Sequence, residues 1–346
     1  MTFGIIGSGS WGTALAKILN DNGEHIHWWN RSESAIEAFK SRSHNPQYLA
    51  SAKFDTSKLI LSSKVKEVIT AADIILIAVP SAYIAEVLFT LPKDIFRGKK
   101  ILSAIKGILP NENVLLNSFL QQHFGVTIEN YFAVLGPCHA EEVATEKLSY
   151  LTFAGSDEET AKKISEYFKT SYIKTVVNKD IIGVQYAAVL KNIYALGAGI
   201  AHGLEYGDNF LSVLIANSAD EMAGFLRKAG IVNAEVGYIE HKNKQALHNT
   251  HNNYAASVYL GDLLVTCYSL FSRNRTFGTM IGKGYSVKAA QLEMSMVAEG
   301  YNASKCMYVI NEKLNVDMPI AENIYKILWE NLSAKEGFKN IELGLI

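Results

Sequence analysis

Cysteine is scarce in this chain, which has 346 residues but only three cysteines, Cys138, Cys267 and Cys306. Because they are odd in number and far apart, we expect reduced thiols rather than a disulfide framework. The sequence also contains no Cys-x-x-Cys pair, and such pairs are common ligands of structural zinc. We therefore expect no metal.

A long, uninterrupted apolar run is also lacking. Near the N-terminus, glycines and serines between Gly7 and Gly12 interrupt the apolar residues, which differs from the apolar core of a signal peptide. We find no stretch long and apolar enough to suggest a bilayer span, so we expect a cytoplasmic protein without membrane insertion. The formal net charge is only −1, which gives no electrostatic reason to expect nucleic acid as a partner.

The first half of the chain alternates short apolar runs with helical patterns. The apolar runs predict strands over residues 2–7, 25–29, 58–61, 73–79, 100–104, 131–135, 150–154 and 172–177. The run over 73–79 is unbroken, which is typical of a strand buried on both faces of a parallel sheet. This alternation predicts an α/β Rossmann domain with a doubly wound, mainly parallel sheet.

The pattern changes near Asn178, and helical periodicity dominates from Asp180 onward. We expect further helices over residues 210–229, 259–269, 286–296, 303–313 and 319–331. The length suits about two domains. We therefore expect a dinucleotide-binding Rossmann domain over residues 1–178 and an all-α substrate and catalytic domain over residues 179–346.

The segment Gly7-Ser-Gly9-Ser-Trp-Gly12 matches the pattern G-x-G-x-x-G. It follows an apolar strand and opens an amphipathic helix, which is the context that a dinucleotide-binding loop requires. In such a loop the first glycine permits a tight turn, the second lets the backbone approach a pyrophosphate, and the third lets the helix pack on the strand. An ordinary glycine turn is the alternative. The sequence thus indicates a dehydrogenase.

The end of the second predicted strand bears on the choice of cofactor. An NAD site usually carries an acidic residue there, which bonds the ribose 2′-hydroxyl. This chain has Asn30-Arg31-Ser32 instead. Arg31 is able to pair with a 2′-phosphate, so we favour NADP(H) and keep NAD(H) open. The alternative is that Arg31 is simply a solvated surface residue.

Two segments follow predicted strands, where ligands of open α/β sheets bind. Lys106 follows the strand over 100–104, although alone it would most often be a surface lysine. The turn Gly136-Pro-Cys138-His139 follows the strand over 131–135 and leads into a helix. Its backbone N–H groups are suited to an anion or a carbonyl oxygen, whereas Cys138 also suits simple packing.

Lys191 and Asn192 lie in a strongly helical, largely apolar segment. Burying a lysine there would cost several kcal/mol unless it is paired, so we expect a partner or a catalytic task rather than a side chain that reaches solvent. Asp262 is the natural partner, since it is a carboxylate in another apolar helix. Ser272-Arg273-Asn274 supplies a hydroxyl, a planar cation and an amide, a set suited to phosphate; a basic loop is the alternative.

The chain resembles the bacterial NAD(P)-dependent glycerol-3-phosphate dehydrogenase family. The motifs that carry the resemblance occur in the family's order: residues 7–16, Ala78-Val-Pro-Ser81, Lys106-Gly107, Gly136-Pro137 with Ala140-Glu141, Leu190-Lys-Asn192, Gly261-Asp262 with Thr266-Cys267, residues 272–275, and Glu299-Gly300.

The resemblance implies reversible reduction of dihydroxyacetone phosphate to sn-glycerol 3-phosphate, which supplies glycerophospholipid precursors. It implies that Lys191 is the proton donor and that Asp262 orients it. The implied substrate site contains Lys106, Gly136, Cys138, Lys191, Asn192, Asp262, Ser272, Arg273 and Asn274. The implied cofactor contacts, besides the three glycines, are Ser10, Trp11, Arg31, Lys106, Ala140, Arg273, Val297 and Glu299. A homodimer follows by analogy only.

This sequence departs from the family's pattern at Cys138 and His139, where many relatives carry Ser or Thr followed by Phe. The stretch over 233–259 also looks longer, and its histidines His241, His248 and His251 fit a surface insertion better than a metal site. Two alternative functions stay open. One is a related hydroxyacid or 6-phosphogluconate-type dehydrogenase, and the other is a non-catalytic NADP(H)-binding sensor.

Overall fold

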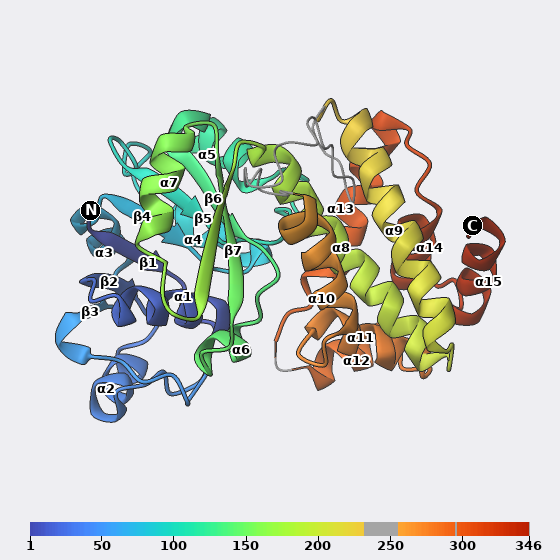
Figure 1. Ribbon diagram of the computed structural model, residues 1–346, viewed down its shortest axis with the longest axis horizontal. Coiled ribbons are helices and arrows are strands. Elements are labelled where there is room, and N and C mark those ends of the chain that lie inside the picture. Colours follow the sequence, from blue (N-terminus) through green and yellow to red (C-terminus); the bar gives the residue numbers. More distant parts are fainter. Residues whose placement is uncertain (232–254, 295, 346) are drawn as a thin grey trace, which may run out of the picture. The chain divides into compact units, whose positions relative to one another are not determined.

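The predicted strands of the first half form one eight-stranded sheet in the order β3-β2-β1-β4-β5-β6-β7-β8 (Figure 1). The strands are β1 (Phe3–Ile6), β2 (Ile26–Trp29), β3 (Leu59–Ser62), β4 (Ile74–Ile77), β5 (Lys100–Ser103), β6 (Tyr131–Leu135), β7 (Ser149–Gly155) and β8 (Ile173–Asn178). Neighbours from β3 to β6 are parallel, β7 is antiparallel to β6, and β8 is parallel to β7. The predicted fold class of this half is confirmed.

The computed structural model describes residues 1–231, 255–294 and 296–345. They divide into two compact units. The first contains Met1–Leu109 and Val114–Ile181, and the second contains Pro110–Asn113 with the chain from Ile182 onward. No sequence pattern indicates that residues 110–113 belong with the second unit.

The helices of the first unit are α1 (Ser10–Asp21), α2 (Glu33–Arg42), α3 (Val65–Ala71), α4 (Ser81–Phe89), α5 (Leu116–Phe124), α6 (Ala140–Ala144) and α7 (Glu158–Glu166). α1 and α3 pack on β1, and α7 packs on β7. All four residues of β1 and all four of β4 are buried, because helices cover the sheet. The strand order reverses between β1 and β4, which is the topological switch point where such sheets bind ligands.

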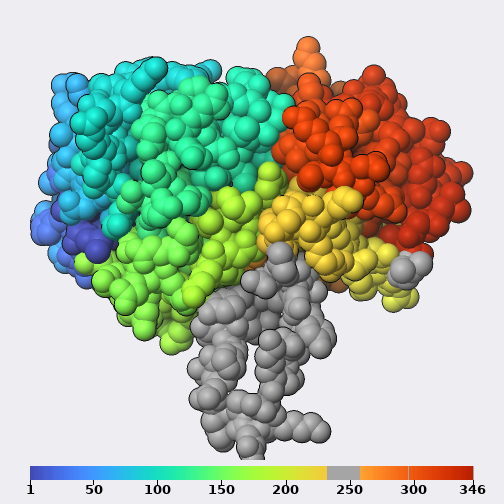
Figure 2. Space-filling model, turned by 90° about the horizontal axis from the view of Figure 1, so that it is seen from above, coloured from blue at the N-terminus to red at the C-terminus, as the bar shows by residue number. Residues whose placement is uncertain are grey.

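The second unit is built around α8 (Ile181–Gly203), whose residues are almost all apolar. Its other helices are α9 (Asp208–Lys228), α10 (Asp262–Tyr268), α11 (Arg273–Gly282), α12 (Val287–Glu293), α13 (Glu299–Leu314), α14 (Pro319–Trp329) and α15 (Ala334–Gly344). The predicted helical character of this half is confirmed. α13, α14 and α15 pack in succession and form the orange-to-red surface in Figure 2.

Among the residues that the structure describes, α8 alone has the length and apolarity of a membrane span, and 89% of its most apolar window is buried inside the protein. α8 meets α11 at glycines. A Cβ atom on Gly278 would lie 2.1 Å from the carbonyl oxygen of Leu196, and one on Gly199 would lie 2.1 Å from that of Arg275. The two helices therefore touch backbone to backbone, which only glycine allows at these positions.

Three helices differ from the sequence prediction, which includes no helix over Ala334–Gly344, the range of α15. Arg273–Gly282 forms α11, so the Ser-Arg-Asn segment is the start of a helix and not a basic loop. The helix predicted over 259–269 begins instead as a π-helical segment, Ala255–Gly261, and becomes α10 at Asp262. Such π-helical insertions occur frequently at functional sites, and here the change of geometry falls directly before Asp262.

Candidate active site

The glycine loop lies at the carboxyl end of β1 and leads into α1. Gly7 has φ +117° and a Cβ atom there would lie 2.7 Å from the carbonyl oxygen of Ala78, so the turn requires glycine. A Cβ on Gly12 would lie 2.4 Å from the carbonyl oxygen of Gly7, which shows how closely the helix packs on the turn. A Cβ on Gly9 would meet nothing within 4 Å. The open side of the loop is therefore at Gly9, where a pyrophosphate needs access.

Two buried donors near this loop fit a bound dinucleotide. The Nε1 atom of Trp11, within the glycine segment at the start of α1, and the Nδ2 atom of Asn30, which follows β2, are buried and have no hydrogen-bond partner. Buried donors are normally paired, so each unpaired one calls for a partner. A dinucleotide with its pyrophosphate at α1 and its ribose at the end of β2 offers oxygen acceptors in both places. Arg31, next to Asn30, is exposed.

Lys106 converges with two other predicted residues of the first unit. Its ammonium nitrogen lies 5.1 Å from the ring centroid of Trp11 and donates to the carbonyl oxygen of Gly136 at 3.3 Å. Gly136 has φ +130°, and a Cβ there would lie 2.7 Å from the carbonyl oxygen of Tyr150. The turn after β6 thus requires glycine, and its carbonyl fixes the lysine beside the indole.

The rest of that turn is close-packed. Cys138 is 6% exposed and Ala140, 7% exposed, is the first residue of α6. Both contribute to the hydrophobic core that also includes the sheet. The structure therefore assigns Cys138 a packing contact in addition to any role toward a ligand.

In the second unit, Lys191 forms an ion pair with Asp262, and the two side chains are 4% and 1% exposed. The Lys191 ammonium also donates to the hydroxyl of Thr266 at 3.1 Å, and that hydroxyl donates to the backbone carbonyl of Asp262 at 2.5 Å. The expected partner of Lys191 is thus present, and the side chain does not reach solvent. A pair with this little exposure requires good hydrogen bonding to be tolerated.

Three helices of the second unit meet at Asn274, which bonds the residue next to Lys191. The Nδ2 of Asn274 donates to the Oδ1 of Asn192 at 2.9 Å, and the Oδ1 of Asn274 accepts from the backbone N–H of Gly300 at 2.9 Å. A Cβ on Gly300 would lie 2.4 Å from the carbonyl oxygen of Asn192. Asn274 therefore joins α11 to α8 and α13. These bonds engage its side-chain oxygen and one of its two amide hydrogens.

Ser272 is the N-cap residue of α11, and its hydroxyl oxygen accepts from the backbone N–H of Arg275 at 3.3 Å. Arg273 is the first residue of the helix. Its guanidinium is exposed and donates to the carbonyl oxygen of Val297 at 3.4 Å. The structure thus brings together Arg273 and Val297, and it places Glu299 at the start of α13. The start of α11 presents a cation and a helix N-terminus, which both attract phosphate.

Comparisons with known proteins cover most of the chain. Residues 2–161 match the model described as NAD-dependent glycerol-3-phosphate dehydrogenase N-terminus, and residues 180–339 match the corresponding C-terminus. The chain belongs to the NAD-dependent glycerol-3-phosphate dehydrogenase family. The predicted family, fold class and enzyme class are therefore confirmed.

Individual members of the family match along most of their length. The glycerol-3-phosphate dehydrogenase, NAD(P)+, of Streptococcus sanguinis is 32% identical over 338 residues, which cover 97% of this chain and 94% of that protein. The one from Bacillus cytotoxicus is 33% identical over 333 residues, 96% of this chain and 92% of that protein. The crystal structure of glycerol-3-phosphate dehydrogenase from Coxiella burnetii has a TM-score of 0.85 and 27% identity, with 98% of each chain covered.

The thiol of Cys267, beside Thr266, is fully buried. Burial raises the pKa of Cys267 to about 12, although the nearby charges of Lys191 and Arg275 act in the opposite direction. The thiolate is therefore almost absent near neutral pH.

Sequence reasoning missed one buried carboxylate, Glu221 on α9. It accepts hydrogen bonds from the Tyr194 hydroxyl at 3.1 Å and from the backbone N–H groups of Ile320 and Ala321 at 2.8 and 3.0 Å. It thereby caps α14 from another helix. No local pattern indicates this, because the donor groups are far away in sequence.

No group of three or more His, Cys, Asp or Glu side chains is placed to hold a metal ion in the part of the chain that the structure describes. His241, His248, His251 and most of the stretch over 233–259 lie outside the described residues.

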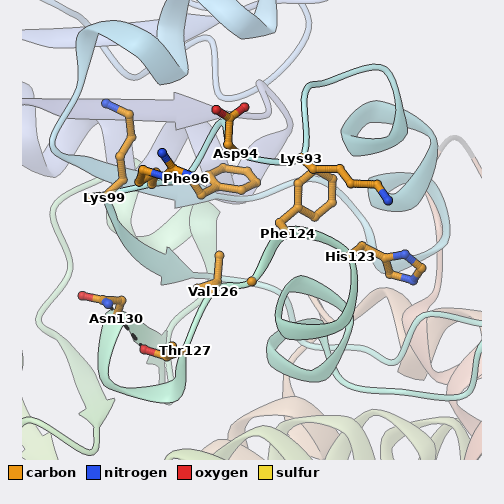
Figure 3. Close-up of a pocket in the computed structure, with 12 residues that line it drawn as sticks. Lys93, Asp94, Phe96, Lys99, His123, Phe124, Val126, Thr127 and Asn130 are labelled. Atoms are coloured by element: carbon orange, nitrogen blue, oxygen red, sulfur yellow. Dashed lines mark hydrogen bonds between the residues drawn. The ribbon is translucent and has the colours of Figure 1, made fainter.

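A hollow of about 520 Å³ in the first unit lies at the amino ends of β5 and β6, the edge opposite the glycine loop. Figure 3 shows Phe96 and Phe124 at its wall, in edge contact with ring centroids 5.4 Å apart. Lys93 and Lys99 point in different directions, and Lys99 donates to the carbonyl oxygens of Thr70 and Ala72. Because Lys93 and Lys99 do not converge on one place where a pyrophosphate could bind, we place the cofactor site at the glycine loop and not in this hollow.

Proposed function

We propose that this chain interconverts dihydroxyacetone phosphate and sn-glycerol 3-phosphate with a nicotinamide dinucleotide, and that Lys191 transfers the proton. The observation that carries this proposal is the buried ion pair of Lys191 with Asp262, further held by the Thr266 hydroxyl. Ketone reduction requires a hydride on carbon and a proton on oxygen. The bound dinucleotide supplies the hydride.

Lys191 is suited to hold and deliver the proton. Its ammonium is held by the Asp262 carboxylate and the Thr266 hydroxyl, and an ammonium group is a hydrogen-bond donor of the kind that a ketone oxygen accepts. As charge develops on that oxygen, a positioned cation stabilises it, an effect often worth a few kcal/mol. Asp262 orients the ammonium, and in the reverse direction the neutral amine accepts the proton from the alcohol.

The start of α11 is our proposed phosphate site. Ser272 and Arg273 provide a hydroxyl hydrogen and a guanidinium there, and the remaining amide hydrogen of Asn274 adds a donor. Lys106, Gly136 and Cys138 complete the proposed substrate contacts in the first unit, where the Lys106 ammonium adds positive charge. A phosphorylated substrate fits this set better than a simple hydroxy acid, because a hydroxy acid gives the cations no phosphate to bind.

The direct test is NADPH oxidation with dihydroxyacetone phosphate. Lys191→Ala should bind NADPH as the wild type does, measured by the fluorescence of the bound nucleotide, while turnover falls by at least about 100-fold, as expected when a general acid is lost. Lys305→Ala removes an exposed lysine of the same unit and should leave both measurements unchanged. Near-normal turnover of the Lys191 variant would remove it from the mechanism.

We further propose that NADPH is preferred over NADH. Support comes from Arg31, which is exposed at the end of β2, and from Glu33, the next carboxylate along the chain, which is already bonded to the Ser63 hydroxyl. Arg31→Ala should weaken NADPH binding and leave NADH binding nearly unchanged, whereas Arg42→Ala, at the end of α2, should alter neither. A wild-type preference for NADH would contradict the proposal.

We also propose a cytoplasmic location, which is expected because the sequence has neither a signal-peptide pattern nor a long apolar run, and a homodimer, which follows from the resemblance to the family by analogy only. Fractionation of cells for enzyme activity tests the first. Light scattering of the purified protein tests the second, and a monomer across the micromolar range would refute it.

A further inference from the structure

The carbonyl oxygens of the glycine loop are each held by a donor within the first unit. The carbonyl of Gly7 accepts from the indole N–H of Trp28 at 3.0 Å, and that of Ser8 accepts from the Nδ2 of Asn45 at 2.9 Å. The carbonyl of Gly9 accepts from the backbone N–H of Thr13 at 2.9 Å, the first turn of α1. Two of these three donors are side chains from outside the loop.

Asn45 is a fully engaged donor. It is 3% exposed and lies in the segment between α2 and β3. Its second amide hydrogen bonds the Thr13 hydroxyl oxygen at 2.8 Å, and its Oδ1 accepts from the backbone N–H groups of Gln47 and Tyr48 at 3.0 and 3.2 Å. With every hydrogen-bonding group of its amide in use, the side chain has one orientation only, and the Ser8 carbonyl is held with it.

Trp28 is equally fixed. Its side chain is fully buried on β2 and packs against Phe39 and Phe54, with ring centroids 5.4 and 5.6 Å away. The indole N–H therefore cannot turn away from Gly7. Because β2 is the direct neighbour of β1 in the sheet, this bond ties the loop to a rigid element.

The orientation of these peptide groups decides what the loop is able to bind. A pyrophosphate requires N–H groups, whereas a carbonyl oxygen turned toward it repels it. Peptides next to glycine rotate with little steric cost, so a free glycine loop would present both orientations. The α1 N-cap is Gly9, which has no side chain to cap the helix, so the orientation must be set from outside the loop.

We propose that Trp28 and Asn45 are positioning residues for the dinucleotide: they hold the Gly7 and Ser8 carbonyls inward, so that the loop is already in its anion-binding form before the cofactor arrives. This role rests on the binding of a nicotinamide dinucleotide at the glycine loop. Trp28 is fully buried and Asn45 is 3% exposed, so we expect their effect to come through the backbone of the loop.

The chain provides a matched control for each residue. Asn20 on α1 is 4% exposed and makes the same kind of brace with Asp55, donating to its carbonyl at 3.1 Å and accepting from its N–H at 2.8 Å. Trp29, the neighbour of Trp28, donates its indole N–H to the carbonyl oxygen of Ser63 at 2.9 Å. Each control loses hydrogen bonds of the same kind when substituted, two for Asn20 against four for Asn45, but none of the bonds of Asn20 or Trp29 holds the glycine loop.

The experiment measures dissociation constants of NADPH, NADH and adenosine 2′-monophosphate for purified protein, together with melting temperatures. Asn45→Ala should bind both dinucleotides about tenfold more weakly. A loss of this size is expected when a hydrogen bond that holds the loop in its binding form is removed. Asn20→Ala should lower the melting temperature similarly and change the dinucleotide constants less than twofold. Trp28→Phe, which keeps the aromatic packing, should weaken dinucleotide binding, whereas Trp29→Phe should not.

Adenosine 2′-monophosphate has no pyrophosphate, so its binding should change less than twofold in all four variants. The proposal is overturned if Asn45→Ala and Trp28→Phe bind dinucleotides as well as their controls do. It is equally overturned if binding of the mononucleotide weakens in parallel, because that indicates general damage to the unit. If the wild type binds neither dinucleotide, the proposed function fails instead.

Discussion

Substitutions in the buried ion pair of Lys191 and Asp262 should change folding stability and catalytic turnover independently of each other. Their side chains are 4% and 1% exposed, so removing one partner strands a charge in the protein interior. Such a change typically costs about 3–5 kcal/mol, whereas replacing both partners with apolar residues of similar volume is often neutral or stabilising. We therefore expect Lys191→Met and Asp262→Val each to lower the free energy of unfolding by about 3–5 kcal/mol.

The double variant should recover most of that loss. The Thr266 hydroxyl keeps its bond to the backbone carbonyl of residue 262, so this hydroxyl is not left without a partner. We expect a total loss of no more than about 1–2 kcal/mol, which corresponds to a favourable coupling of several kcal/mol between the two sites.

The assay is urea unfolding followed by circular dichroism, with NADPH-dependent turnover measured on the same samples. The double variant should be inactive although it is stable, because the proton donor is absent. If the costs of the two single changes simply add, the charges do not compensate each other and the reasoning fails. If the double variant turns over normally, Lys191 has no catalytic role.

Two further predictions concern the second unit. Burial raises the pKa of Glu221 from 4.5 to about 7, against the hydrogen bonds from the backbone of α14 and from Tyr194. The contribution of Glu221 to stability is therefore complete below pH 4.5 and is lost as the pH rises through about 7. In the wild type the free energy of unfolding should fall between pH 5 and 8, and Glu221→Gln should reduce this fall by on the order of 3 kcal/mol. An unchanged pH dependence in the variant would contradict this. Gly278→Ala, whose Cβ would lie 2.1 Å from the carbonyl oxygen of Leu196, should cost about 1–3 kcal/mol in urea unfolding, whereas Gly224→Ala on α9, with nothing within 4 Å, should stabilise by about 0.5–1 kcal/mol; equal effects would refute the close approach of α8 and α11.

The elements of the first unit were accessible from the sequence because their signals are local. An unbroken apolar run such as 73–79 contains all the information that makes β4 a buried strand. The three glycines likewise carry their own steric reasons, since Gly7 needs its positive φ and Gly12 contacts the turn a few residues before it. The helices α11 and α15 were not predicted, because their apolar faces are short and mixed with polar residues.

The pairing within the site was only partly accessible. A lysine in an apolar helix indicates a buried charge that requires a partner, so the pairing of Lys191 with Asp262 could be predicted. For Asn274 the sequence predicts only a contact with the substrate phosphate. In the structure its amide also joins α11 to Asn192, which lies 82 positions earlier. The buried cap that Glu221 places on α14 had no sequence signal at all.

What the sequence determined by itself is therefore the chemistry carried by short, contiguous segments: the glycine turn, the buried strands, and the lysine that requires compensation. What only the tertiary structure decided is which distant groups meet them. Trp28 reaches Gly7 across 21 positions and Asn45 reaches Ser8 across 37, and neither follows from periodicity. The physical reason is that a hydrogen bond depends on a distance of about 3 Å and on direction, which folding sets and sequence separation does not.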